Sequence, residues 1–161
     1  MKKQVTAFIC IIVFNFEAIF ASTDFSFKRL SGGKTDFRTI TTWCSIQDSY
    51  GFLWIGTSDG LNCYDGCGNR VYRNALNNKY SLGNNFVSSL LEEGENIWVG
   101  TNSGLYIYDR STDRFSYFNE TTRYGVFVSS EVKKIIKTQS GLIWIATLGQ
   151  GVFIYEPVTG V

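Results

Sequence analysis

A tryptophan-centred segment recurs three times in this sequence and constrains the fold more than any other feature. Its three copies read LWIGT, IWVGT and IWIAT. Trp54 and Trp98 are 44 residues apart, and Trp98 and Trp144 are 46 residues apart. A period of about 40 to 50 residues is typical of β-propellers, in which each repeat forms one blade, whereas a period of about 33 residues is typical of helical repeats. The spacing therefore predicts one propeller blade per repeat.

A second apolar segment follows each tryptophan segment and predicts a hairpin. The second segments read GLNCYD, GLYIYD and GVFIYE, at residues 60–65, 104–109 and 151–156. The turns before them contain glycine with Asn or Asp, which tolerate the positive φ of tight hairpin turns. Further strands are expected at residues 42–47, 86–91 and 132–137, and at 69–73 and 114–118. The sequence predicts an all-β fold, a partial β-propeller of about three four-stranded blades that is not closed.

Residues that recur at the same place in each copy are assigned a structural role. The tryptophans are expected to pack between adjacent blades, where each removes on the order of 150 to 250 Å² from water. The glycines are expected to allow close approach of neighbouring backbones. The complete set of structural repeat residues is Trp54, Gly56, Thr57, Gly60, Leu61, Tyr64, Asp65, Trp98, Gly100, Thr101, Gly104, Leu105, Tyr108, Asp109, Trp144, Thr147, Gly151 and Tyr155.

The amino-terminal residues have the layout of a secretory signal peptide. Met1-Lys2-Lys3 is basic, and residues 5–16 are apolar but short for a membrane span, which needs about 20 residues. We expect cleavage after Ala21 and export of the remainder, and the alternative is an uncleaved anchor. The expected organisation is a signal peptide (1–21), an amino-terminal strand segment (22–38), blade 1 (39–82), blade 2 (83–126) and a partial blade 3 (127–161).

Composition excludes several classes of function. The sequence contains no histidine, so it holds no Ser-His-Asp or Cys-His nucleophile, no His-ligated zinc and no phosphoacceptor histidine. The formal net charge of +1 gives no field for nucleic acid or for an anionic membrane. Glycine-rich phosphate loops and calcium-loop carboxylates are absent from the sequence as well. We therefore expect no cofactor, no metal, no catalytic residue and no nucleic-acid partner, and contact with a membrane only through an uncleaved signal segment.

Cleavage of the signal peptide leaves an odd number of cysteines in a compartment where disulfides form. These are Cys44, Cys63 and Cys67, because Cys10 is removed. Cys63 and Cys67 are close enough in sequence for a small-loop bridge, but a C-x3-C pair alone is a weak metal signal. The favoured interpretation is three unpaired residues in the core or in turns.

At residues 53–65 and 97–109 the chain is similar to the two-component regulator propeller repeat. These segments read LWIGTSDGLNCYD and IWVGTNSGLYIYD, and the third copy departs from the pattern at Ala146 and Gln150. The segment SLGNNFV at residues 81–87 is also similar to the stretch that begins a new blade in that family. The resemblance extends over roughly residues 25–157.

The resemblance implies a periplasmic sensor at the amino end of a hybrid two-component sensor kinase of Bacteroidetes. It also implies recognition of glycan fragments, control of polysaccharide-utilisation genes, and a first strand at residues 25–30 that completes the last blade of a ring. The kinase, receiver and DNA-binding parts of that family are absent from this sequence. With three blades and no closure, we expect a truncated or split product whose outer faces pair with the missing remainder of the propeller or with another chain.

Three functions remain open at this level. The first is an exported ligand-binding module for oligosaccharides, in which Tyr50, Phe52 or Tyr124 stacks on a sugar, although no single ligand-binding residue is assigned. The second is an exported propeller enzyme of the lyase or hydrolase type, for which the nearest carboxylates are Asp48, Asp59, Asp65 and Glu92. Turn capping explains these carboxylates better. The third is an interaction module that docks by strand addition at an unpaired sheet edge.

Overall fold

The computed structural model describes residue 26, residues 41–118 and residues 128–157. The expected signal peptide (1–21) and nearly all of the amino-terminal strand segment (22–38) lie outside the described residues. Eleven strands and three antiparallel sheets make up the described part. Within these ranges there is no helix with the length and apolar character needed to cross a bilayer.

Each sheet is a meander in which strands that follow one another in the chain are hydrogen-bonded neighbours. The first sheet contains β1 (Thr42–Gln47), β2 (Leu53–Thr57), β3 (Gly60–Tyr64) and β4 (Asn69–Tyr72). The second contains β5 (Val87–Glu93), β6 (Asn96–Thr101), β7 (Gly104–Asp109) and β8 (Arg114–Tyr117). The third contains β9 (Val132–Lys137), β10 (Ile143–Thr147) and β11 (Val152–Tyr155). The predicted fold class is confirmed, and the third sheet has three strands in the described part of the chain rather than four.

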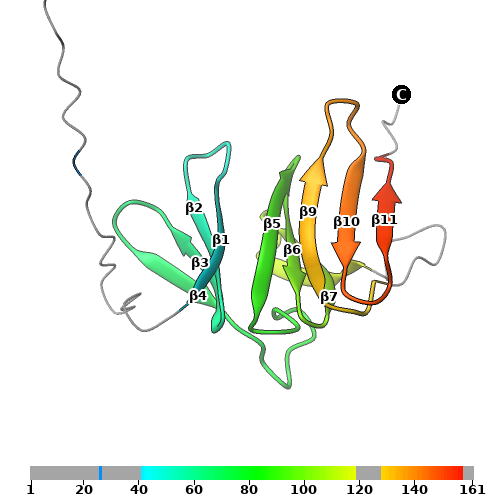
Figure 1. Cartoon of the computed structure of the whole chain (residues 1–161). Coiled ribbons are helices and arrows are strands. Elements are labelled where there is room, and N and C mark those ends of the chain that lie inside the picture. Colours follow the sequence, from blue (N-terminus) through cyan, green and yellow to red (C-terminus); the bar gives the residue numbers. More distant parts are fainter. Residues whose placement is uncertain (1–25, 27–40, 119–127, 158–161) are drawn as a thin grey trace, which may run out of the picture.

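The three sheets stack face to face in chain order. Their first strands lie nearest one another, with β5 between β1 and β9, and their later strands extend outward (Figure 1). This is the arrangement of neighbouring propeller blades, in which each sheet buries one face against the next. The hydrophobic residues consequently form two separate clusters, one at each junction between sheets.

A threonine and a glycine hold each tryptophan hairpin in shape. The Thr57 hydroxyl donates to the Gly60 carbonyl oxygen at 2.8 Å, and the Thr101 hydroxyl donates to that of Gly104 at 2.9 Å. The two glycines have φ of 115° and 110°, a region that side chains with a Cβ rarely adopt. Thr147 makes the same bond in the third sheet, at 2.7 Å. The recurrence of Thr and Gly in the sequence therefore reflects one turn repeated three times.

A second pair of glycines lets the sheets approach closely. A Cβ on Gly56 would lie 2.7 Å from Val87 Cγ1, and a Cβ on Gly100 would lie 2.7 Å from Val132 Cγ1. Each glycine lies on the second strand of a sheet, and each valine begins the first strand of the next sheet. The expected close approach at the glycines is thus a contact between neighbouring sheets.

The tryptophans join an aromatic trio at each junction. The trio consists of the tryptophan, an aromatic residue in or just after the outer strand of the same sheet, and a tyrosine from the third strand of the next sheet. Their ring centroids lie 5.0 to 5.9 Å apart, a range in which aromatic pairs attract. The two trios are Trp54, Tyr72 and Tyr108 at the first junction, and Trp98, Phe118 and Tyr155 at the second.

Trp144 differs from the other two repeat tryptophans. Trp54 and Trp98 are 2% and 5% exposed, whereas Trp144 is 39% exposed. In the described part of the chain, Trp144 is therefore not enclosed between two sheets, whereas Trp54 and Trp98 are. Its face of the third sheet has no further sheet against it in the described part of the chain.

Candidate functional site

A pocket of about 480 Å³ opens between the first and second sheets. It lies at the end of the sheets where the β1–β2, β3–β4 and β7–β8 turns meet. Both aromatic and polar side chains line it. Its lining residues are Phe52, Trp54, Cys63, Asp65, Gly68, Asn69, Arg70, Tyr72, Tyr108 and Arg110.

The turns beside the pocket are held by aspartates at equivalent places in the repeat. Asp65 accepts hydrogen bonds from the backbone N–H groups of Cys67 and Gly68, at 2.8 and 2.6 Å. Those bonds to Gly68 and Cys67 hold the pKa of Asp65 below its ordinary value. Asp109 caps the β7–β8 turn in the same way, accepting from the Ser111 N–H at 2.8 Å. The two aspartates of the structural repeat thus position the loops that carry the pocket residues.

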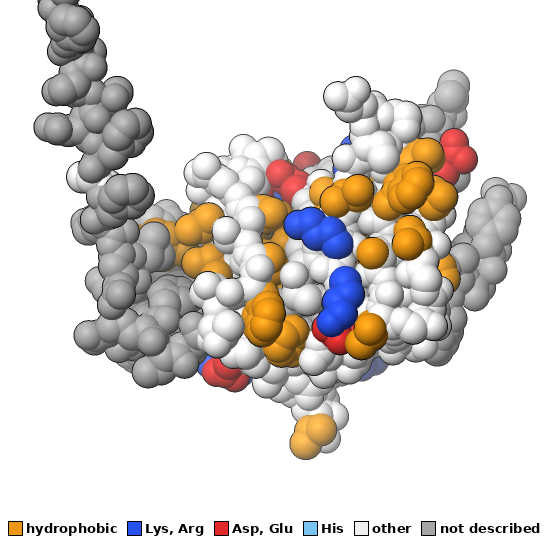
Figure 2. All heavy atoms as spheres, in the orientation of Figure 1, with side chains coloured by type: hydrophobic (Ala, Val, Ile, Leu, Met, Phe, Trp, Pro, Cys, Tyr) orange, Lys and Arg blue, Asp and Glu red, His pale blue; other side chains and the backbone are white. Residues whose placement is uncertain are grey.

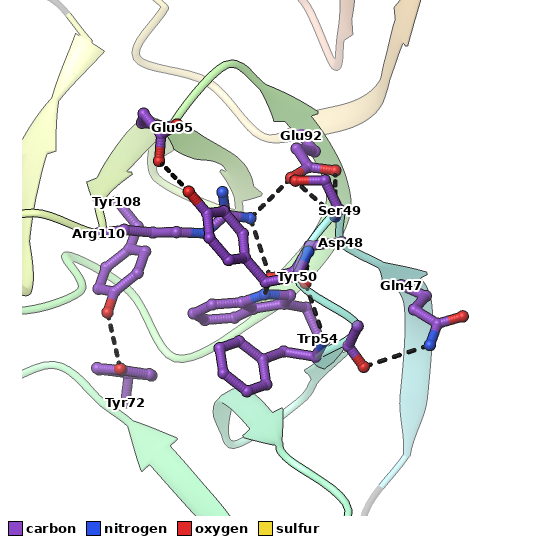
Figure 3. Close-up of polar contacts among 12 residues, drawn as sticks. Gln47, Asp48, Ser49, Tyr50, Trp54, Tyr72, Glu92, Glu95, Tyr108 and Arg110 are labelled. Carbon is purple, nitrogen blue, oxygen red and sulfur yellow. Dashed lines mark hydrogen bonds and ion pairs between the residues drawn. The ribbon is translucent and has the colours of Figure 1, made fainter.

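Arg110 joins the two sheets at one edge of the pocket. Its Nη2 donates to Asp48 Oδ2 and to Glu92 Oε1, at 2.9 Å each. The guanidinium carbon lies 4.8 Å from the centre of the Tyr50 ring, so the charge is held between an aromatic face and two carboxylates (Figure 3). The Tyr50 hydroxyl in turn donates to Glu95 at 2.8 Å. Arg110 comes from the second sheet and Asp48 from the first, so the contact closes the junction.

Asp48 is the buried end of this network. Its side chain is fully buried, and Oδ1 accepts from the N–H groups of Tyr50 and Phe52 at 3.0 and 2.8 Å. Oδ2 accepts from Trp54 Nε1 at 2.7 Å as well as from Arg110. A buried carboxylate is tolerated only when it is paired and hydrogen-bonded, and both conditions hold here. Asp48 therefore fixes the β1–β2 turn, the indole of Trp54 and the Arg110 side chain together.

Glu92 completes the charged network from β5. Both of its carboxylate oxygens accept from the Ser49 N–H at 3.0 Å, and Oε1 accepts from the Ser49 hydroxyl at 2.7 Å. Burial acts to raise the pKa of Glu92, but the bonds from Ser49 and the Arg110 charge outweigh it and lower that pKa. Burial also acts to lower the pKa of Arg110, and Glu92 and Asp48 outweigh that effect and raise it. Glu92 and Arg110 therefore stay charged at neutral pH.

Two tyrosines form the inner wall of the pocket. The Tyr72 and Tyr108 hydroxyls lie 3.0 Å apart, and the Tyr108 hydroxyl donates to Asp113 at 2.8 Å. Burial, together with the hydrogen bonds to Tyr72 and Asp113, raises the pKa of Tyr108, so its hydroxyl remains a donor. Arg70 lies at the rim, 3.2 Å from Asp113.

Three buried polar atoms near the pocket have no hydrogen-bond partner among the described residues. They are Arg110 Nε, Arg110 Nη1 and Asn69 Oδ1. Buried polar atoms are normally satisfied, so these groups mark a part of the junction whose hydrogen bonding is incomplete among the described residues. The lining of the pocket itself combines guanidinium groups, an amide and aromatic side chains.

The cysteines of the described residues are all free. Burial raises the pKa of Cys44 and of Cys63 to about 11, so both are neutral thiols at physiological pH. Cys63 lines the pocket and Cys67 lies exposed in the neighbouring turn, while Cys10 lies outside the described residues. In the ranges 41–118 and 128–157 no group of three Cys, Asp or Glu side chains could hold a metal ion.

The carboxylates considered for catalysis all make structural contacts. Asp48 and Glu92 bond to Arg110, and Asp65 caps a turn, as described above. Asp59 forms an exposed ion pair with Arg73 at 2.8 Å. Because each carboxylate serves a turn, a hairpin or the junction, the arrangement suits binding better than acid–base chemistry.

Of the aromatic residues considered for ligand stacking, two are described and lie close to the pocket. Phe52 lines it and is 38% exposed, and Tyr50 covers Arg110 beside it and is 59% exposed. Tyr124 lies outside the described residues. The structure thus brings Tyr50 and Phe52 together on one turn, the one between β1 and β2.

Most structural repeat residues lie in the two junction cores or in the hairpin turns. Leu61 and Leu105 are fully buried, as are Thr57 and Thr101. Tyr64 is half-buried, and its hydroxyl donates to the Gly66 carbonyl oxygen at 2.7 Å. These residues build the sheets that carry the pocket, and of the repeat set only Trp54, Asp65 and Tyr108 line it.

Sequence reasoning missed Arg110, which closes the first junction. The signal that could have found it is its departure from the repeat. After the shared tyrosine and acidic residue, the first copy has Gly66 and the third has Pro157, whereas the second has Arg110. A charged residue that appears in one copy alone has no role in the repeated scaffold and is a candidate for a specific contact.

Comparison with known families finds this repeat in two places. Residues 37–59 and 81–103 match the family described as two component regulator propeller. These ranges contain the first two strands of the first and second sheets, including the strand that carries the tryptophan. No curated protein matches the chain.

The chain also resembles solved extracellular domains from B. thetaiotaomicron. It is 24% identical to the domain of a protein described as a hybrid two component system, BT3049, with a TM-score of 0.64, and the match covers 74% of this chain and 17% of that one. A domain of BT4673, also described as a hybrid two component system, is 24% identical with a TM-score of 0.40, over 75% of this chain and 21% of that one. The chain spans about a sixth of the length of the BT3049 domain and has the same fold over that part. Residues 37–59 and 81–103 thus resemble two component regulator propeller repeats, and the chain shares the propeller fold of the BT3049 domain over the matched part.

Proposed function

We propose that this chain is an exported, ligand-sensing propeller region of a hybrid two-component regulator and that its ligand is a glycan fragment. The observation that carries the proposal is the pocket between the first and second sheets, where Phe52, Tyr72 and Tyr108 lie beside Asn69 and Arg70. Sugar rings pack their apolar faces on aromatic side chains, and their hydroxyls bond to amide and guanidinium groups. A concave site with these groups is the default binding site of a structure.

The assignment to a regulator is supported by fold. The BT3049 domain, whose fold this chain shares, is described as the extracellular domain of a hybrid two component system. That support is an analogy, because one fold hosts many functions. Export is supported by the signal-peptide layout of residues 1–21.

Binding rather than catalysis is supported by the state of the carboxylates. A glycoside hydrolase needs a carboxylic acid that donates a proton and a carboxylate that is free to act as base or nucleophile. Glu92 has its pKa lowered and both oxygens engaged, and Asp48 is held by backbone, indole and guanidinium donors. Glu92 therefore lacks the raised pKa of a general acid, and both oxygens of Asp48 already accept hydrogen bonds.

The test is calorimetric titration of the full chain with a panel of plant and host oligosaccharides, followed by product analysis. We expect saturable binding without bond cleavage. Phe52→Ala should weaken binding about tenfold or more through loss of a stacking surface, and Arg70→Ala should weaken it by a similar factor. Leu76→Ala is the matched control, because Leu76 is 98% exposed and does not line this pocket.

Two outcomes would contradict the proposal. Cleavage of a glycosidic bond by the full chain would make it an enzyme. Binding that Phe52→Ala and Arg70→Ala leave unchanged would show that the ligand binds outside this pocket.

A further inference from the structure

A second pocket, of about 740 Å³, lies between the second sheet and the connection that joins β4 to β5, residues 73–86. The connection lies at the end of the sheets opposite the β1–β2 turn (Figure 1), and it projects from the body of the molecule into solvent (Figure 2). The pocket has the volume of a ligand site, about 300 to 1,000 Å³. It shares no lining residue with the pocket between the first and second sheets. We call it the connection pocket, and its lining includes Asn78, Lys79, Tyr80, Tyr106 and Tyr117.

Hydrogen bonds within the connection hold it in a fixed shape. The Ser81 hydroxyl accepts from the Ala75 N–H at 3.0 Å and donates to the Asn78 carbonyl oxygen at 2.7 Å. The Phe115 N–H of β8 donates to the Tyr80 carbonyl oxygen at 2.9 Å, which ties the connection to the outer strand of the second sheet. A site that is already formed binds more tightly, because less order is lost to binding.

Two tyrosines form one wall of the connection pocket. Tyr106 of β7 and Tyr117 of β8 are a cross-strand pair with ring centroids 5.1 Å apart. A Cβ on Gly83 would overlap the Tyr106 ring, so the glycine leaves the space that this side chain occupies. Aromatic walls of this kind accept the apolar face of a sugar ring.

Two cations lie beside the pocket without a carboxylate partner. Lys79 Nζ is 4.9 Å from the centre of the Tyr80 ring, and the Arg114 guanidinium carbon is 4.3 Å from the same centre. Cation–π attraction therefore holds both charges next to one ring. Neither cation forms an ion pair among the described residues. Asp113, which precedes Arg114 in the chain, pairs with Arg70 instead.

The charge of the connection pocket differs from that of the pocket between the first and second sheets. There Arg70 and Arg110 are each paired with a carboxylate, and Asp65 is part of the lining. The connection pocket is lined by Lys79 and, in the described part of the chain, by no carboxylate. Uncompensated positive charge at a concave site attracts anions.

We propose that the connection pocket is a second binding site and that its ligand is an acidic sugar, a uronic acid residue of an oligosaccharide. The carboxylate of the sugar pairs with Lys79 and Arg114, which supply charge-assisted hydrogen bonds. Its ring packs on the tyrosine wall, and its hydroxyls bond to the amides of Asn77 and Asn78. This site is independent of any glycan in the pocket between the first and second sheets.

The test is calorimetric titration of the full chain with the trisaccharide of galacturonic acid and with its methyl ester, which is uncharged. We expect the acid to bind about tenfold more tightly than the ester, because only the acid pairs with the cations. The difference should shrink as salt is raised from about 50 mM to about 300 mM, because salt screens exposed charges.

Substitutions locate the binding. Lys79→Gln and Arg114→Gln should each weaken binding of the acid about fivefold and leave the ester unaffected. Both side chains are exposed, so neither change threatens the fold. Lys133→Gln is the matched control, because it removes the same charge from the third sheet, where Lys133 pairs with Glu131. It should bind the acid as the natural chain does.

Three results would overturn the proposal. Equal affinity for the acid and the ester would show that charge is not recognised. Equal losses in Lys79→Gln and Lys133→Gln would show a general effect of net charge. Acid binding that Phe52→Ala weakens and Lys79→Gln does not would place the acidic sugar in the pocket between the first and second sheets. That last result would support the proposed function while overturning this inference.

The opposite pattern would separate the two proposals in the other direction. Acid binding that Lys79→Gln weakens, in a chain whose glycan binding is unchanged by Phe52→Ala and Arg70→Ala, would support the connection pocket. It would contradict the proposed role of the pocket between the first and second sheets.

Discussion

The junction between the first and second sheets and the junction between the second and third use the same apolar contacts but different polar ones. Both contain an aromatic trio, and both bring a valine against a glycine. The first is closed by Arg110 between two carboxylates, whereas the second has one ion pair among the described residues, Lys137 with Glu93 at 2.6 Å. The apolar interior thus follows the repeat, and the polar rim depends on individual residues. The candidate pocket lies at the rim that departs most from the repeat.

We expect the largest difference in stability between substitutions of Trp98, which is buried, and Trp144, which is partly exposed. Trp98→Ala should reduce the free energy of unfolding by about 3 to 5 kcal/mol, because it empties a packed junction core. Trp144→Ala should cost about 1 kcal/mol, because its ring is already part exposed and lacks the tyrosine of a trio. Urea unfolding followed by circular dichroism measures both. Equal losses would mean that the third sheet is packed as tightly as the second.

The next largest difference in stability should be between substitutions in the polar contacts at the edges of the two junctions. Arg110→Ala should cost about 3 kcal/mol, because it leaves the buried Asp48 carboxylate without its charge partner. Lys137→Ala should cost about 0.5 kcal/mol or less, since its side chain is 42% exposed and the pair is screened by water. Arg110→Lys is the control that keeps the charge but loses the two-carboxylate bridge, and it should fall between them. If Arg110→Ala reduced the free energy of unfolding as little as Lys137→Ala does, the Arg110 network would stabilise the protein no more than a surface ion pair.

The glycine contact should give a smaller effect that depends on its partner. Gly100→Ala should cost about 1 to 3 kcal/mol through overpacking against Val132. Combined with Val132→Ala, the same change should cost less than the sum of the single changes by about 1 kcal/mol. A double-mutant cycle in urea provides the measurement. Simple additivity would indicate that the sheets move apart freely and that the close approach is not required.

The smallest expected effect is a pH dependence confined to the first junction. The pKa of Glu92 is lowered in the folded chain from an ordinary value of 4.5, so its stabilising contribution is fully present above about pH 4.5 and is lost as pH falls through the folded pKa. The stability difference between the natural chain and Glu92→Gln should therefore shrink on acidification from about pH 7 to pH 3. Thermal unfolding across this range checks it. Glu93→Gln, at the second junction, is the comparison variant, and a constant difference for Glu92→Gln would contradict the expectation.

The repeated hairpins could be predicted from the sequence because their contacts join residues that are close together in the chain. The Thr and Gly of each hairpin lie three or four residues apart and meet within one turn, so their recurrence at residues 57–60 and 101–104 marks the strands directly. The spacing of the tryptophans showed the length of the repeat, and that length predicted the propeller architecture. The second sheet differs slightly from expectation, since β5 continues to Glu93 and its last residues carry the charges of both rims.

The candidate site was less accessible, because its contacts join residues far apart in the chain. Arg110 and Asp48 are separated by 62 positions, and no pattern in either segment links them. The Tyr72 and Tyr108 hydroxyls meet across the junction although each tyrosine, viewed alone, fits a core position. The two residues flagged for stacking, Tyr50 and Phe52, do lie beside the pocket. Their placement followed from the turn that Asp48 caps, which becomes apparent only in three dimensions.

Two serines of β5 bind backbone groups of the neighbouring edge strand β9. The Ser88 hydroxyl donates to the Val132 carbonyl oxygen, and the Ser89 hydroxyl accepts from the Ile135 N–H at 2.9 Å. These backbone groups lie on β9, an edge strand of its sheet, and an edge strand with free groups invites uncontrolled pairing with other chains. With hydroxyls already bound there, this stretch of the inner rim is a poor template for aggregation.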